Sequence, residues 1–233
     1  MVSSVRSLDM TKLGAEYCPM DHVIGSLQLS SLKEITIRGR YSFQSAEWLR
    51  SCTNLKKLHL EGCAPVDDLL SLLSACPALE HLTLKHHSNV VDLAPLASCD
   101  ELRHVELIQC DRIDDLSPLA SCKALQKLKI QLKRRVVDLR PLASCASLQF
   151  LDLQKSYKTR DLAPLASCTA LRYLDLSWCP VTDLRPLLSC TGLEELHLLH
   201  CDAIKFHIPL SRKWSSDRKT RPAGWHRVPR IPT

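Results

Sequence analysis

The side chains of this sequence best suited to chemistry are its twelve cysteines and ten histidines. Thiolates and imidazoles bind transition metals, and both can act in catalysis. Metal or redox cysteines are usually closely spaced, but the chain contains no C-x-x-C pair. Seven cysteines instead recur every 22 to 24 residues: Cys52, Cys76, Cys99, Cys122, Cys145, Cys168 and Cys190. We interpret them as small buried side chains without disulfides, because free cysteine packs as a small apolar residue.

Two histidine-containing pairs, His86 with His87 and His200 with Cys201, have the residue types of a metal site. Neighbouring residues of a strand point to opposite faces of the sheet, so neither pair can hold one ion in regular backbone. The sequence therefore predicts no metal and no cofactor.

Motifs of catalysis are also absent from the sequence. It has no glycine-rich phosphate loop, no G-x-S-x-G and no H-E-x-x-H. Aspartates do recur, but at one position per repeat: Asp68, Asp92, Asp115, Asp138, Asp161 and Asp183. We interpret them as acceptors for free N–H groups at the start of a short turn, and we expect a non-enzymatic protein.

A repeat of 22 to 24 residues organises the chain. Each unit reads L-x-x-L-x-L-x-x-C/x and continues, after about five residues, as D-L-x-P-L-x-S-C. The first leucine of each unit falls at Leu32, Leu55, Leu79, Leu102, Leu125, Leu148, Leu171 and Leu193. A weaker copy starts at Val5, so the chain has about nine units, of which the first and last are degraded.

Each unit predicts one strand and one turn. Apolar residues alternate with polar ones in segments such as Leu128/Ile130 and Leu151/Leu153, which is the period of a strand buried on one face. In the D-L-x-P-L segment a proline opens a helical or 3-10 turn. Since one unit cannot bury its own leucines, the units must stack. We expect an α/β solenoid, a right-handed arc with a parallel sheet on its concave face and short turns on its convex face.

The repeated L-x-x-L-x-L-x-x-C and D-L-x-P-L segments resemble the leucine-rich repeat superfamily, in particular its short internalin-like and phosphatase-regulator-like class. The resemblance covers residues 5 to about 210. Asparagine usually stands in that class where this chain has Cys63, Cys110, Cys179 and Cys201, and the chain departs further with His87, Lys133 and Ser156. The resemblance implies binding of proteins through the inner face.

The inner face should carry exposed columns formed by the residues between the buried leucines. One column runs Glu34, Lys57, His81, His104, Lys127, Phe150, Tyr173 and Glu195, and the next runs Thr36, His59, Thr83, Glu106, Lys129, Asp152, Asp175 and His197. Aromatic side chains beside charges are typical of interface hot spots. We predict that Phe150, Tyr173 and Trp178 anchor a partner and that Asp152 and Asp175 select a basic one. In the alternative, the aromatics cover sheet edges or pack beneath the tail.

The net charge of +6 belongs to the end of the chain. Residues 211–233 contain seven lysines and arginines against one aspartate, so residues 1–210 are neutral. We divide the chain into a solenoid, 1–210, and a basic tail, 211–233, whose composition predicts disorder. Clustered bases attract polyanions, so nucleic-acid binding is an alternative that depends on the tail alone.

The sequence thus predicts a scaffold or adaptor that binds an unidentified protein partner, with no small-molecule substrate. An alternative is the substrate-recognition part of a ubiquitin-ligase or phosphatase assembly, which rests only on what similar repeats do. No apolar run reaches the roughly 18 to 20 residues of a membrane span. The first residues do not resemble a secretory signal. We therefore expect a cytoplasmic protein, with the nucleus as the alternative.

Overall fold

The computed structural model of the chain describes residues 6–9, 28–39, 47–62, 73–87, 90–132 and 138–205. Within these ranges, one strand and one short turn alternate along the chain. The strands are β1 (Ser7–Asp9), β2 (Glu34–Arg38), β3 (Lys57–Glu61), β4 (His81–Lys85), β5 (His104–Ile108), β6 (Lys127–Gln131), β7 (Phe150–Asp152), β8 (Tyr173–Asp175) and β9 (Glu195–His197). The turns are 3-10 helices, η1 (Leu29–Ser31), η2 (Glu47–Ser51), η3 (Leu73–Ala75), η4 (Ala94–Ser98), η5 (Ser117–Ser121), η6 (Arg140–Ser144), η7 (Ala163–Ser167) and η8 (Arg185–Ser189).

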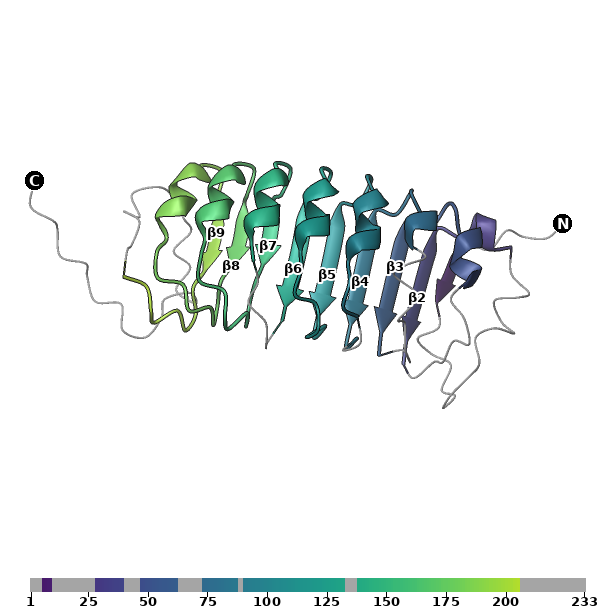
Figure 1. Cartoon of the computed structure of the whole chain (residues 1–233), viewed down its shortest axis with the longest axis horizontal. Helices are drawn as coiled ribbons and strands as arrows, with labels where there is room; N and C mark the ends of the chain where they lie inside the picture. The colour runs from purple at the N-terminus through teal and green to yellow at the C-terminus, as the bar shows by residue number, and fades with distance from the viewer. Residues whose placement is uncertain are drawn as a thin grey trace, which may run out of the picture.

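The described strands form one open, parallel sheet in chain order. Figure 1 shows them side by side in a single row, with the 3-10 turns in a second row that follows the same order. Equivalent repeat positions lie opposite each other, as in Leu58 with Leu82 and Leu128 with Leu151. The weak first unit keeps this register, because Leu8 pairs with Ile35. The leucine-rich solenoid expected from the sequence is confirmed.

Each strand buries one face, as its alternating pattern predicts. In β6, Leu128 and Ile130 are fully buried, whereas Lys127, Lys129 and Gln131 remain partly exposed. The first leucine of each unit, such as Leu125, and the leucine inside each turn, such as Leu119, are buried in the same core. The core is therefore one continuous layer between the sheet and the row of 3-10 turns.

An aspartate accepts a backbone hydrogen bond at the start of each regular 3-10 turn. The Ala94 N–H donates to Asp92 Oδ1 over 2.7 Å, and the Arg185 N–H donates to Asp183 Oδ1 over 2.9 Å. Asp115, Asp138 and Asp161 accept equivalent bonds in their own units. These carboxylates satisfy N–H groups that the short helix leaves free, so the predicted structural role of the aspartates is confirmed. Asp68 lies outside the described residues.

The periodic cysteines are buried, as predicted, and they also link neighbouring units. From Cys76 onward, each thiol donates to the carbonyl oxygen of a leucine one unit earlier. The donor and acceptor pairs are Cys76 and Leu49, Cys99 and Leu73, Cys122 and Leu96, Cys145 and Leu119, Cys168 and Leu142, and Cys190 and Leu165, at 3.3 to 3.8 Å. The burial of these cysteines follows from their spacing in the sequence, but their hydrogen bonds do not.

A second ladder occupies the position where the related class usually has asparagine. The Cys110, Cys179 and Cys201 thiols donate to the Leu84, Leu153 and Leu176 carbonyls, respectively. Ser156 Oγ donates the equivalent bond to the Ile130 carbonyl at 3.3 Å, so a serine hydroxyl can take the place of the thiol at this position. His87 is buried at the same position, where the backbone of Leu60, one unit earlier, interacts with its ring as a hydrogen-bond partner of poorer geometry than in the thiol ladder. Cys63 and Lys133 lie outside the described ranges.

A left-handed residue follows the strand in several units. Glycine holds this conformation at Gly62, with φ +67°, whereas later units place larger residues there. These are His86, Gln109, Lys155, Trp178 and His200, with φ between 55° and 68°. A left-handed backbone costs a residue with a Cβ atom about 1 to 2 kcal/mol, so each of these side chains occupies a strained turn.

The predicted tail, 211–233, lies outside the described residues, and the division of the chain at residue 210 stays a prediction. Among the residues that the structure describes, no helix has the length and apolar character needed to cross a bilayer.

We expect Leu151→Ala to lower the free energy of unfolding by about 2 to 5 kcal/mol, because it leaves a cavity in the core between neighbouring repeat units. Urea denaturation followed by circular dichroism would measure the loss. Leu188→Ala is the matched control: Leu188 is 54% exposed, and its truncation should change stability by less than about 0.5 kcal/mol. Equal losses in the two variants would contradict the stacked core.

The buried thiols predict a loss of stability at alkaline pH. Burial raises the pKa of Cys122 and Cys168 from the ordinary value of 9.0 to about 12. A group with a raised folded-state pKa stabilises the fold below its unfolded pKa and loses that contribution as the pH rises toward its folded pKa. The free energy of unfolding should therefore fall between pH 9 and pH 12.

Replacing both thiols gives the control for this pH dependence. In the Cys122→Ser, Cys168→Ser variant, hydroxyl groups that do not ionise in this range can still donate to the same carbonyls. Denaturant titrations at pH 8 and pH 11 should show a smaller fall in this variant than in the wild type. An identical fall would show that other groups cause the alkaline loss.

Candidate protein-binding surface

The exposed face of the sheet corresponds to the inner face expected from the sequence, and it carries a row of rings over β7, β8 and β9. The register places Phe150, Tyr173 and Glu195 opposite one another. The Phe150 and Tyr173 rings stack in parallel, with centroids 4.1 Å apart and planes 4° apart. The His197 ring continues the row, 5.1 Å from Tyr173. We call Phe150, Tyr173, His197, Trp178 and His200 the aromatic patch.

Lys127 lies at one end of the row formed by the Phe150, Tyr173 and His197 rings. Its Nζ lies 4.8 Å from the centroid of Phe150, within the range of a cation–π contact. The same Nζ is 3.8 Å from a carboxylate oxygen of Glu106. At the other end of the row, Glu195 lies 3.5 Å from His197 Nε2. The row of rings thus has a charged side chain at each end.

Trp178 lies on the turn that follows β8, where it belongs to a second pair of rings. It is 39% exposed, and its ring lies 3.8 Å from the ring of His200 in the next unit. Both residues occupy the strained left-handed position, with φ of 68° and 57°. Backbone geometry favours glycine there, so the fold itself gives no reason for a tryptophan.

Asp152 and Asp175 do not have the exposure that the sequence analysis expected, and that expectation is wrong. Asp152 is 5% exposed and Asp175 is 7% exposed. Each carboxylate folds back onto its own chain, where it accepts a hydrogen bond from the N–H two residues later, that of Gln154 or Ser177. Strands β7 and β8 end at the two aspartates, although backbone hydrogen bonds to the next unit continue beyond them, as from the Leu153 N–H to the Asp175 carbonyl.

The two aspartates also act on their neighbours. Asp152 Oδ2 lies 2.7 Å from Lys129 Nζ, so its charge is already paired within the chain. Desolvation, followed by the negative charges of Asp175 and Asp152, raises the pKa of Tyr173 to about 12. The Tyr173 hydroxyl is therefore protonated at neutral pH, and it can donate a hydrogen bond from the surface.

Three of the five residues in the aromatic patch, Phe150, Tyr173 and Trp178, were predicted from the sequence, whereas His197 and His200 were not. The repeat spacing places His197 in an exposed column, but its contact with Tyr173 depends on ring positions that spacing does not supply. The adjacent Cys201 makes His200 resemble half of a metal pair in the sequence, whereas its ring contacts Trp178 in the structure. The signal that could have found it is its position one unit after Trp178, at a spacing of 22 residues.

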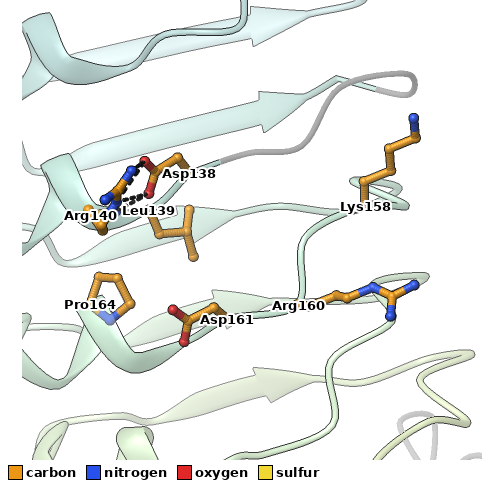
Figure 2. A pocket seen from close by; sticks show the side chains of 7 residues that line it. All are labelled: Asp138, Leu139, Arg140, Lys158, Arg160, Asp161 and Pro164. Atoms are coloured by element: carbon orange, nitrogen blue, oxygen red, sulfur yellow. Dashed lines mark hydrogen bonds and ion pairs between the residues drawn. The ribbon is translucent and has the colours of Figure 1, made fainter.

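An open hollow of about 600 Å³ lies elsewhere, between the loops that lead into η6 and η7. Its lining comprises Asp138, Leu139, Arg140, Lys158, Arg160, Asp161 and Pro164. Figure 2 shows Arg140 joined to Asp138, with Lys158 and Arg160 extending from the neighbouring loop. All three cations are exposed, so water screens their charge and weakens any anion contact. The aromatic patch is therefore the better candidate surface.

No cluster of three or more potential metal ligands occurs among the described residues. The ten described cysteines are all unpaired and buried. Burial raises the pKa of these thiols, to about 11 in Cys99 and about 12 in Cys179, which disfavours the reactive thiolate at neutral pH.

Comparisons with known proteins agree with this geometry. A family model for the leucine-rich repeat matches residues 167–184, and no curated protein sequence matches the chain. The fold is similar to that of internalin C2 from Listeria monocytogenes, with 25% identity, a TM-score of 0.66, and coverage of 82% of this chain and 80% of that one.

Two further solved structures share the fold. The internalin inlF of the same organism has 19% identity and a TM-score of 0.52, and the match covers 80% of this chain and 64% of that one. The ectodomain of the Arabidopsis receptor kinase HAESA, solved with a peptide hormone ligand, has 18% identity and a TM-score of 0.57, and the match covers 76% of this chain and 34% of that one.

We expect Asp175→Ala to destabilise the protein by about 1 to 3 kcal/mol, because the buried Ser177 N–H loses its acceptor. Asp175→Asn should cost less, since an amide oxygen can still accept that bond. Chemical denaturation of the two variants measures the difference. If neither variant lost stability, the structural role given to Asp175 would be wrong.

Proposed function

We propose that this leucine-rich repeat protein is a non-enzymatic interaction module that binds a protein partner through the aromatic patch. The observation that carries the proposal is the row of Phe150, Tyr173 and His197 rings on the exposed face of the sheet, together with the Trp178–His200 ring pair on the turns that follow β8 and β9. These rings lie outside the buried core of the solenoid.

The composition of the patch supports this proposal. Tyrosine and tryptophan are enriched among the residues that contribute most to binding energy at interfaces. Their rings bury a large area, and few torsions need to be fixed on binding. The stack of Phe150 with Tyr173 already fixes both rings, so a partner meets a preformed surface and little side-chain entropy is lost.

The charged groups around the patch define the rim of the proposed contact. Lys127 and Glu195 lie at opposite ends of the ring row. The carboxylates of Asp152 and Asp175 are buried beneath the surface and bonded within the chain. We therefore base the proposed contact on the rings, with no direct role for the two aspartates.

The similar folds support a binding role of this general kind. The HAESA ectodomain, which shares the fold, is solved in complex with a peptide hormone. A partner that belongs to a ubiquitin-ligase or phosphatase assembly is one form that the proposed interaction can take. Nucleic-acid binding through residues 211–233 is a competing function, and the experiment below separates the two.

We expect the Tyr173→Ala, Trp178→Ala variant of the full chain to lose its protein partners in affinity capture from native cell extract. Loss of two hot-spot rings should weaken binding by at least about 30-fold. The control is Tyr157→Ala, Leu188→Ala, which removes two exposed side chains outside the patch. Circular dichroism should show that both variants fold.

Two results would contradict the proposal. In the first, the patch variant retains every partner that the wild type and the control retain. In the second, capture by all three proteins disappears on addition of nuclease or about 0.5 M salt, as expected for polyanion binding. The second result would assign the binding to the basic residues 211–233.

A further inference from the structure

Two histidines face each other on the exposed side of the sheet, two strands away from the stack of Phe150 and Tyr173. His81 on β4 lies directly opposite His104 on β5 in the parallel register. Their Nδ1 atoms are 2.7 Å apart, and the rings meet edge to face with centroids 4.2 Å apart. Both side chains are half-buried. The two Nδ1 atoms therefore face each other across the register of β4 and β5.

Two neutral imidazoles at this distance form one hydrogen bond, in which the Nδ1–H of one ring donates to the Nδ1 lone pair of the other. A metal ion can replace that shared proton when the donor ring carries its hydrogen on Nε2 instead, in the other tautomer of neutral imidazole. Desolvation, followed by the charge of Lys57, lowers the pKa of His81. Desolvation, followed by the charge of His81 and then that of Lys127, lowers the pKa of His104. Both shifts favour the neutral rings that a metal ion requires.

The charges around the pair balance. The groups that act on the two rings are Lys57, Arg103 and Lys127, which are positive, and Glu34, Glu80 and Glu106, which are negative. Several of these charges are already paired, with Lys57 Nζ 3.7 Å from Glu34 and Lys127 Nζ 3.8 Å from Glu106. Their summed charge gives no strong barrier to a cation.

We propose that His81 and His104 together bind a divalent transition-metal ion of the class that favours imidazole, such as Zn²⁺, through their two Nδ1 atoms. Zinc–nitrogen bonds are about 2.0 to 2.1 Å long, so tetrahedral binding separates the two nitrogens by roughly 3.4 Å. Small rotations of the two half-buried rings supply the difference from 2.7 Å. This proposal is independent of the proposed partner contact.

The site has two protein ligands and two open positions. No third histidine, cysteine or carboxylate completes a cluster there among the described residues. Water or a ligand from another molecule must therefore fill the remaining positions of a tetrahedral ion. Such an ion exchanges readily, unlike the closed structural sites that hold four protein ligands.

The test is a zinc titration of the full-length protein in a reducing buffer, followed by the imidazole ¹⁵N resonances. Zinc should shift the Nδ1 resonances of His81 and His104 specifically, and this readout in the wild type does not depend on the folding of a variant. Zinc should also raise the melting temperature, because an ion that binds the folded state stabilises it.

Variants then identify the ligands. His81→Gln and His104→Gln should each weaken zinc binding by about tenfold or more, since loss of supporting groups alone costs 10- to 100-fold in metal sites. The matched control is His59→Gln. It removes a histidine that lies on β3, on the same face of the sheet as the pair, and it should leave zinc binding unchanged. Affinity in the wild type should fall as the pH drops through the imidazole pKa, because protons compete for the ligand nitrogens.

The proposal would be overturned if millimolar zinc shifted neither the Nδ1 resonances nor the melting temperature. It would also be overturned if the His81→Gln, His104→Gln double variant bound zinc as tightly as the wild type. That second result would assign the ion to other groups, such as thiols, and leave the histidine pair as a hydrogen bond within the sheet.

Discussion

The structure depends on the burial of each unit's leucines by the next unit in the stack. Three apolar side chains from a strand segment and one from a 3-10 turn cannot shield one another from water within a single unit. A neighbour covers them only when equivalent positions lie opposite one another, as Leu128 and Leu151 do. This requirement fixes the parallel register of the described sheet, and the register in turn places the exposed residues in columns. Both candidate sites, the aromatic patch and the His81–His104 pair, follow from that alignment.

Hydrogen bonds inside and between the units make this stacking compatible with a polar backbone. Buried carbonyl and N–H groups need partners, because an unpaired one costs free energy comparable to a lost hydrogen bond. The aspartate before each regular turn accepts a free N–H, as Asp92 does for Ala94. The thiol after each turn from η3 to η8 donates to a carbonyl one unit earlier, as Cys145 does to Leu119. The cysteines of the two ladders therefore have a structural role in linking neighbouring units.

The exposed face is where the units differ without disturbing the core. Stacked Phe150 and Tyr173, the strained Trp178 and the edge-to-face histidines all lie there, and none of them fills the buried layer. Asp152 and Asp175 show that a residue on this face can also have a local role. Their carboxylates turn back onto the backbone and accept the N–H groups of Gln154 and Ser177. Beyond the two aspartates, the chain turns at Lys155 and Trp178, and this turn exposes the tryptophan.

The repeat by itself determined the solenoid, the order of strands and turns, the buried cysteines and the aspartate acceptors, because each follows from one spacing repeated along the chain. It also placed Phe150 beside Tyr173, since parallel strands in register align equivalent positions. Only the tertiary structure decided what the side chains do within those positions. The burial of Asp152, the contact of Trp178 with His200 and the 2.7 Å approach of His81 to His104 depend on torsions that spacing leaves free. A periodic sequence specifies which residues are neighbours, but packing and local hydrogen bonds specify which of their atoms meet.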